Sequence, residues 1–253
     1  MSDAADASTG ESSRRRRRRP RLWREGRSTT RRWDLGLLSW AVCALGAGLL
    51  AERAASALFP PETAEASARA MVWVALGVPV GVAFSRSRPR GLLRLRPVDV
   101  LYGIVFGVAL RAMQGAVAGI GGAPAAWPST FSSDGSLPEA FLAEALADTI
   151  GAAMVEEFFF RGVVLVCAYV LLRERSGRVP AAIAAVALST ALFVLAHQFA
   201  AGQDHLAPIA LAAVGAVTGA FVVATGRIWP AVAVHMVFNA TGYALVAAGT
   251  LLS

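Results

Sequence analysis

Seven long apolar stretches follow one another along the chain, and they constrain the fold more than any other feature. A helix needs roughly 20 apolar residues to cross the ~30 Å hydrocarbon core of a bilayer. The stretches approach or exceed that length, at residues 34–51, 70–85, 98–118, 138–172, 180–200, 206–225 and 228–250. The sequence therefore predicts an all-α, multi-pass transmembrane helical bundle with about seven membrane helices.

The fourth stretch, 138–172, is too long for a single crossing. Its first part carries Glu139, Glu144 and Asp148 among apolar residues, which is typical of an amphipathic segment that begins near Pro138. We expect this segment either to lie at the membrane interface or to form a separate short helix. A separate helix would raise the number of spans to eight.

The distribution of arginine predicts how the bundle is oriented. All 24 basic residues are arginines, and many occupy the start of the chain, the connections 86–97 and 173–179, and the turn at Arg227. The connections 119–137 and 201–206 contain no arginine. Because cytoplasmic loops carry an excess of basic residues, we expect a cell-membrane protein with its N-terminus in the cytoplasm and, with seven spans, its C-terminus outside.

The first 32 residues differ in composition from the rest of the chain. They hold 11 arginines and 4 acidic residues, and 11 − 4 = +7 equals the net charge of the whole chain. Residues 1–32 are expected to form a disordered arginine-rich tail, and residues 33–253 a membrane-embedded domain. A basic tail directly before a membrane helix favours membrane lipid over nucleic acid as its partner. The pattern does not define an oligomeric state.

Three ionisable side chains in the fourth stretch are the first candidates for function. Burying a charged side chain at the centre of a membrane helix costs roughly 2.5–3.5 kcal/mol. Glu157 and Arg161 are spaced i, i+4, in the order that favours an ion pair. Glu156 points about 100° away around the helix, which leaves it free for another role. The alternative is that all three residues only join neighbouring helices.

Two of the three histidines also lie inside apolar stretches. His197 follows Phe193 by four residues, and His235 shares one helix face with Asn239. A single buried histidine usually belongs to the core, but two histidines on different spans, beside a glutamate pair, favour a site. His205 lies in a short polar loop and is expected to be ordinary surface.

This set of side chains suits the hydrolysis of a peptide bond, which needs a base to activate water and donors to stabilise the oxyanion. Alternatively, Glu156, His197 and His235 can hold a divalent metal such as zinc, with an open position for water. The sequence contains neither a His-Glu-x-x-His motif nor a Gly-x-Ser-x-Gly elbow, and neither cysteine neighbours a histidine. A serine or cysteine mechanism therefore finds no support.

Three motifs in this order resemble a known family. They are Glu156-Glu157-x-x-x-Arg161, Phe193-x-x-x-His197 and His235-x-x-x-Asn239. They are similar to those of the CAAX-protease and bacteriocin-processing (CPBP) family, which includes the type II CAAX prenyl endopeptidases, also called the Abi family. The resemblance covers residues 138–245, the predicted protease core.

The resemblance implies an intramembrane endopeptidase that acts on a membrane-associated protein or peptide, with a prenylated CAAX protein as one option. It implies that Glu156 and His197 activate water and that His235 and Asn239 stabilise the oxyanion. Glu157, with Arg161, would hold the site together. Both a zinc-dependent and a metal-free mechanism remain open.

Two other functions compete with a protease. An ion-coupled transporter would also carry buried Glu, His and Arg, but such carriers more often show inverted repeats or interrupted spans, which the sequence lacks. A catalytically silent immunity or scaffold protein could share the fold, although it has no evident need for the complete motif set.

The depths of the candidate residues conflict if every helix is straight. At ~1.5 Å per residue, Glu156 lies about 24 Å from the arginine-rich end of its stretch and His197 about 27 Å from that end of its own. His235 lies only about 9 Å from the start of the last stretch. These residues meet only if helices are tilted or broken, if the last span begins inside the protein, or if the predicted boundaries are wrong.

Overall fold

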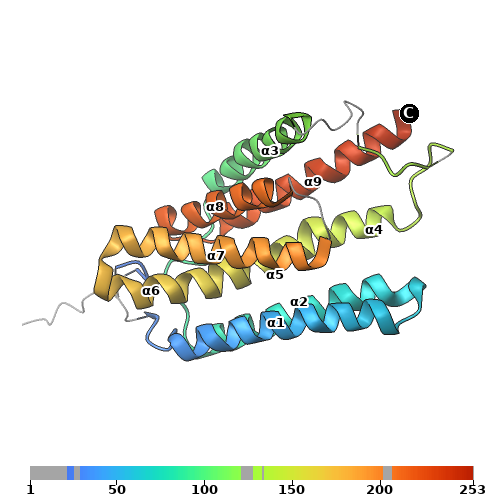
Figure 1. Cartoon of the computed structure of the whole chain (residues 1–253). Coiled ribbons are helices and arrows are strands. Elements are labelled where there is room, and N and C mark those ends of the chain that lie inside the picture. Colours follow the sequence, from blue (N-terminus) through green and yellow to red (C-terminus); the bar gives the residue numbers. More distant parts are fainter. Residues whose placement is uncertain (1–21, 26–28, 121–127, 133, 202–206, 253) are drawn as a thin grey trace, which may run out of the picture.

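The computed structural model describes residues 22–25, 29–120, 128–132, 134–201 and 207–252, and its regular structure within these ranges is helical, with no strand (Figure 1). This confirms the predicted all-α, multi-pass architecture. Six of these helices are long and apolar enough to cross a membrane. They are α1 (Leu35–Leu58), α2 (Pro61–Arg86), α3 (Pro97–Ile120), α7 (Arg178–Ala201), α8 (Ala207–Thr225) and α9 (Trp229–Leu252).

The fourth predicted stretch forms one continuous helical rod. Its segments are α4 (Phe141–Leu146), η2 (Ala147–Ala152), α5 (Ala153–Glu157), η3 (Phe158–Val164) and α6 (Leu165–Ser176), where η2 and η3 are π-helical. The residue at each junction keeps helical backbone angles. The rod is therefore one continuous helical element about 50 Å long, and with the six long apolar helices it fits the predicted count of about seven.

Side chains from neighbouring helices support the two π-helical segments. Asn239 Nδ2 donates a hydrogen bond to the backbone carbonyl of Asp148 in η2, at 2.9 Å. Ser189 Oγ donates to the carbonyl of Phe160 in η3, also at 2.9 Å. π-helical turns disturb the regular backbone ladder and occur frequently at functional sites. Here they flank α5, which carries Glu156 and Glu157.

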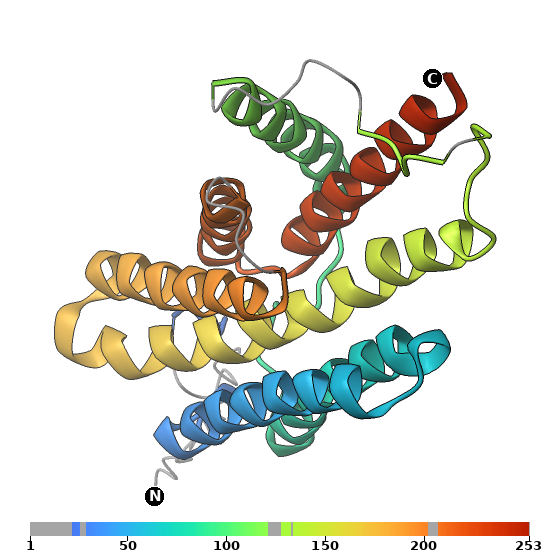
Figure 2. The same cartoon turned by 45° about the vertical axis from the view of Figure 1, so that its right-hand side comes forward.

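The helices pack around the rod in three groups. Figure 2 shows α1 and α2 as a hairpin on one side of the rod, α3 beside α9, and α7 running back along α6. The centre of the rod forms the core of the protein, because every residue from Phe159 to Val170 is buried. This segment contacts α1, α2, α7 and α8, so most of the bundle packs on it.

The described part of the predicted tail is packed against this core. Trp23 and Trp33 are both fully buried. Trp23 donates from Nε1 to the carbonyl of Gly226 at 2.9 Å, and its ring meets that of Tyr169 edge-on. Trp23 and Thr30, which lie before the domain boundary predicted at residue 33, are therefore packed against the helical bundle. The arginine run before residue 22, and His205, lie outside the described residues.

The conflict in depth arises from the position of the α6–α7 turn. The ring of Trp229 contacts that of Phe158, with centroids 6.1 Å apart, so α9 begins beside the middle of the rod. Ser176, at the end of α6, lies 18 residues beyond Phe158, or about 27 Å along a helix. The α6–α7 hairpin thus extends well past the level at which α9 begins. The depths of Glu156 and His197 refer to the distant α6–α7 turn, whereas the depth of His235 refers to the start of α9. The three depths therefore do not refer to the same level of the bundle.

A test of this packing is available at the contact between α3 and α9. A Cβ atom on Gly107 would lie 2.7 Å from Val237 Cβ and 2.9 Å from the carbonyl oxygen of Val234. Gly107→Ala is therefore expected to lower the free energy of unfolding by about 1–3 kcal/mol, because a tightly packed contact cannot take the extra methyl group. Thermal unfolding in detergent measures the change.

Gly115 on the same helix provides the control, because a Cβ there would meet no atom within 4 Å. Gly115→Ala should leave the stability unchanged or raise it by up to about 1 kcal/mol through better helix propensity. Equal effects of the two substitutions would contradict the close contact of α3 with α9.

Candidate active site

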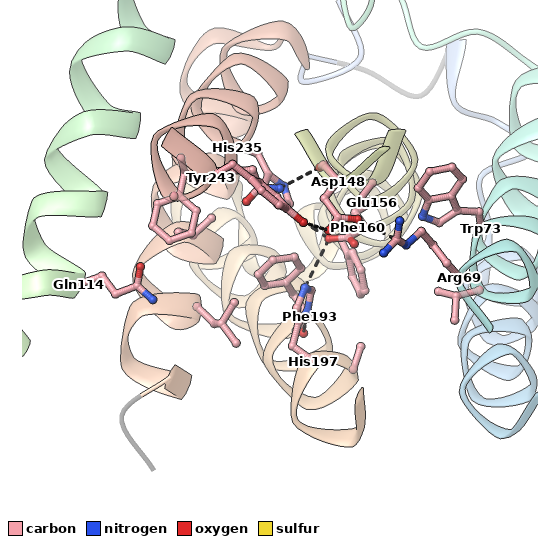
Figure 3. Close-up of a pocket in the computed structure, with 18 of the residues that line it drawn as sticks. Arg69, Trp73, Gln114, Asp148, Glu156, Phe160, Phe193, His197, His235 and Tyr243 are labelled. Atoms are coloured by element: carbon pink, nitrogen blue, oxygen red, sulfur yellow. Dashed lines mark hydrogen bonds and ion pairs between the residues drawn. The ribbon is translucent and has the colours of Figure 1, made fainter. Parts of the chain in front are cut away.

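Glu156, His197 and His235 come together from three different helices at one wall of a cavity (Figure 3). Glu156 Oε2 lies 3.6 Å from Nε2 of His197 and 4.0 Å from Nε2 of His235. Three of the residues singled out in the sequence therefore meet, although their spacing along straight helices argued against it. They meet because α9 begins beside the middle of the rod and contacts α5, which carries Glu156.

The hydrogen bonds of the two imidazoles fix which nitrogen faces Glu156. His197 Nδ1 lies 2.9 Å from the carbonyl oxygen of Phe193, which can only accept, so Nδ1 carries the proton. His235 Nδ1 lies 2.9 Å from Oε1 of Glu157 and, beside a carboxylate, also acts as a donor. Each imidazole therefore directs Nε2 toward the carboxylate of Glu156, and these three atoms can share a proton or a water molecule.

Glu157 and Arg161 lie behind the two imidazoles and hold His235 in place. Both side chains are fully buried, and Arg161 Nη1 lies 3.1 Å from the same Oε1 of Glu157 that faces His235. The guanidinium also lies over the ring of Phe193, 4.4 Å from its centroid. Glu157 is thus placed between a fixed cation and an imidazole, as the i, i+4 spacing of the sequence predicted for its pairing with Arg161.

The charges of the cluster balance when it binds one additional proton. Two carboxylates, Glu156 and Glu157, face one guanidinium, Arg161, which leaves a net charge of −1 if both histidines are neutral. An uncompensated charge in an apolar interior is costly. One proton distributed over Glu156, His197 and His235 neutralises the cluster. A group of this kind is suited to moving a proton during a reaction.

Asn239 lies one helical turn beyond His235 on the same face of α9. One of its two amide hydrogens is committed to the Asp148 carbonyl, and the second is available to a ligand. The residue lines the cavity together with the histidines. The structure therefore places all six predicted site residues in one region, with Glu157 and Arg161 behind the cavity wall.

The sequence interpretation missed a second polar group that lines the same cavity. Asp148 accepts a hydrogen bond from the hydroxyl of Tyr243 and lies 3.5 Å from Nε of Arg69, which also pairs with Glu65. The signal for Tyr243 was present, since His235, Asn239 and Tyr243 recur every four residues on one face of α9. Arg69 gave no comparable signal, because it lies just before the predicted apolar stretch 70–85, whereas α2 begins at Pro61.

The cavity itself has a volume of about 1360 Å³. Its walls are largely apolar, and the polar groups gather where Glu156, the two histidines, Asn239 and Asp148 line it. Pockets that bind small molecules or peptide segments commonly combine apolar walls with a few convergent polar groups. The volume is sufficient for several residues of an extended peptide.

Glu156, His197 and His235, the three predicted metal ligands, lie at or slightly beyond the spacing of zinc ligands. Zn²⁺ bonds to nitrogen and oxygen ligands are about 2.0–2.2 Å long and tetrahedral, which places neighbouring ligand atoms roughly 3.3–3.6 Å apart. The 3.6 Å between Glu156 Oε2 and His197 Nε2 is compatible with this spacing, and the 4.0 Å to His235 Nε2 is slightly longer. The donor types suit the metal, but the described residues contain no group of three or more His, Cys, Asp or Glu side chains that could hold one as arranged here.

The fold and the site define a multi-pass helical membrane protein with a glutamate–histidine cluster inside the bundle. Residues 138–241 match the family model described as type II CAAX prenyl endopeptidase Rce1-like. This match covers most of the predicted protease core and supports its assignment to the CAAX protease family, whose members are proteases. No curated protein and no solved structure matches the chain.

Proposed function

We propose that the protein is an intramembrane endopeptidase in which Glu156 and His197 activate the water that attacks a peptide bond. The observation that carries the proposal is the convergence of Glu156 Oε2 and the Nε2 atoms of His197 and His235 on one point of the cavity wall. A carboxylate and an imidazole nitrogen on the two sides of a water can together orient it and take its proton.

In the first step, Glu156 takes a proton from a water that also donates to Nε2 of His197. The water oxygen forms a bond to the carbonyl carbon of the substrate, and the carbonyl π electrons move to its oxygen. His235, doubly protonated beside the Glu157 carboxylate, donates from Nε2 to this oxyanion. The free amide hydrogen of Asn239 is the second donor, and such donors lower the barrier for acyl transfer.

In the second step, Glu156 returns the proton to the amide nitrogen as the C–N bond breaks. The oxyanion electrons re-form the carbonyl double bond, and the products are a carboxylic acid and an amine. Transfer of the acid proton to the amine gives a carboxylate and an ammonium ion, so atoms and charges balance without another reactant. Glu157 and Arg161 do not touch the substrate in this scheme. They act as positioning residues that hold His235 in the orientation that the reaction needs.

The substrate class follows from the membrane location and from the family. The matching family is described as a CAAX prenyl endopeptidase, and for this chain we propose the broader substrate class of membrane-associated proteins or peptides. The test compares the N-termini of membrane proteins from cells with the native chain and from cells with a Glu156→Gln variant. Protein termini that depend on the native chain identify the substrate, and identical sets of termini would contradict the proposal.

The role of Asn239 can be separated from its contact with the helix. Asn239→Ala is expected to lower kcat by about 10²–10³-fold, the usual cost of removing one oxyanion donor. Ser189→Ala is the matched control, because Ser189 also donates one 2.9 Å hydrogen bond to a carbonyl of a π-helical segment. It should lower the stability to a similar extent and leave kcat nearly unchanged. Similar kcat values for the two variants would make Asn239 a structural residue.

A further inference from the structure

The cavity lies toward one end of the helical bundle. In α1, α2, α3, the rod, α7 and α8, nearly all cavity residues fall in the half of the helix that leads to the connections 59–60, 121–140 and 202–206, whereas in α9 they start at His235 and continue toward the C-terminus. They lie within 45–56 in α1, 64–76 in α2, 111–119 in α3, 148–160 in the rod, 193–197 in α7, 211–214 in α8 and 235–246 in α9. In Figure 1 the α1–α2 connection and the C-terminus mark this end of the molecule, opposite the α6–α7 turn.

The opposite end of the bundle is filled with buried side chains and is called the solid end below. Between Glu156 and Tyr169, about 20 Å along the rod, the residues from Phe159 onward are all buried. Trp23, Leu92 and Ile228 add fully buried side chains. The N-terminal segment is bonded to this layer through Trp23 and through Arg24, whose carbonyl accepts from Tyr169 and Arg173. On the rod, the cavity lining among the described residues ends at Phe160 and does not extend toward this side.

The arginines mark the solid end. The connections and turns at this end carry most of the loop arginines of the described chain, at positions 24, 31, 32, 88, 90, 94, 96, 173, 175, 178 and 227. The three connections at the open end contain none in the sequence. Since arginine-rich loops remain in the cytoplasm, the solid end faces the cytoplasm and the cavity opens away from it.

We infer that the substrate of this protease is an extracytoplasmic polypeptide segment, which reaches Glu156 from the outer surface of the membrane. The inference rests on the proposed function for the identity of the reacting groups, but the direction of the opening stands independently of it. A prenylated CAAX terminus is held by its lipid at the cytoplasmic face, on the far side of the solid layer. Such a terminus is therefore not the substrate of this chain.

Two serines provide a matched pair for testing the orientation. Ser56 lines the cavity near the end of α1, and Ser176 ends α6 at the opposite end of the molecule. Both are exposed, and both donate a 3.0 Å hydrogen bond to the carbonyl four residues earlier. Ser56→Cys and Ser176→Cys would be made in a chain that also carries Cys43→Ala and Cys167→Ala. Intact cells are then treated with a membrane-impermeant maleimide, before and after permeabilisation.

We expect Ser56→Cys to be labelled in intact cells and Ser176→Cys only after permeabilisation. The reverse pattern, labelling of both in intact cells, or no labelling of Ser56→Cys even after permeabilisation would each overturn the inference. Labelling needs no catalysis, so a chain without protease activity would still give the expected pattern. Where cleavage sites are found, they should lie in extracytoplasmic segments, and a site at a prenylated cytoplasmic terminus would overturn the substrate class.

Discussion

Replacing Glu156 with glutamine is expected to lower the rate of cleavage by about 10²–10⁴-fold, the usual contribution of a positioned general base. Glutamine keeps the size of the side chain but cannot take a proton from water. Glu156 Oε2 has no hydrogen-bond partner among the described residues, so the substitution leaves no partner unpaired. The stability of the protein should therefore change little. The measurements are the appearance of cleaved termini in membranes and thermal unfolding of the purified protein in detergent.

Glu144→Gln is the control for this experiment, because Glu144 lies on the same rod but does not line the cavity. It should cleave at the native rate. A Glu156→Gln variant with near-native activity would remove Glu156 from the chemistry. A variant that loses both activity and stability would instead assign Glu156 a structural role.

The sequence predicted the parts of the site that depend on local spacing. The i, i+4 pairing of Glu157 with Arg161 and the shared face of His235 and Asn239 follow from helix geometry, and the structure has both. Their meeting across the bundle could not be predicted in this way. It depends on where α9 starts relative to the rod, which is set by the contact of Trp229 with Phe158, far apart in the sequence.

The N-terminal segment is a second case in which composition alone did not predict the structure. Residues 22–33 are rich in arginine, and a basic segment before a membrane helix is usually a solvated tail. Two tryptophans in the segment, Trp23 and Trp33, carried the opposite signal, because large aromatic side chains are rarely left in solvent. Their burial depends on partners such as Gly226 and Ser87, which no local pattern connects to the tail.

Breaking the Glu157–Arg161 pair is expected to have the largest effect on stability. Glu157→Gln leaves the guanidinium of Arg161 fully buried without its counter-ion, and Arg161→Met leaves the carboxylate of Glu157 in the same position. Removing one partner of a buried ion pair typically lowers the free energy of unfolding by about 3–5 kcal/mol. The Glu65–Arg69 pair has the same spacing, but Glu65 is 74% exposed. Glu65→Gln should therefore cost less than about 1 kcal/mol.

The double variant Glu157→Gln, Arg161→Met distinguishes folding from catalysis. Both buried charges are removed together, so most of the lost stability should return, as is common when a buried pair is replaced as a unit. Activity should not return, because His235 then lacks the carboxylate that holds its Nδ1 proton and supports its charged form. If the double variant recovered both stability and cleavage, Glu157 would contribute only to folding. If it recovered neither, the loss would not come from an unpaired charge, and the packing of Arg161 on Phe193 would be the dominant contribution.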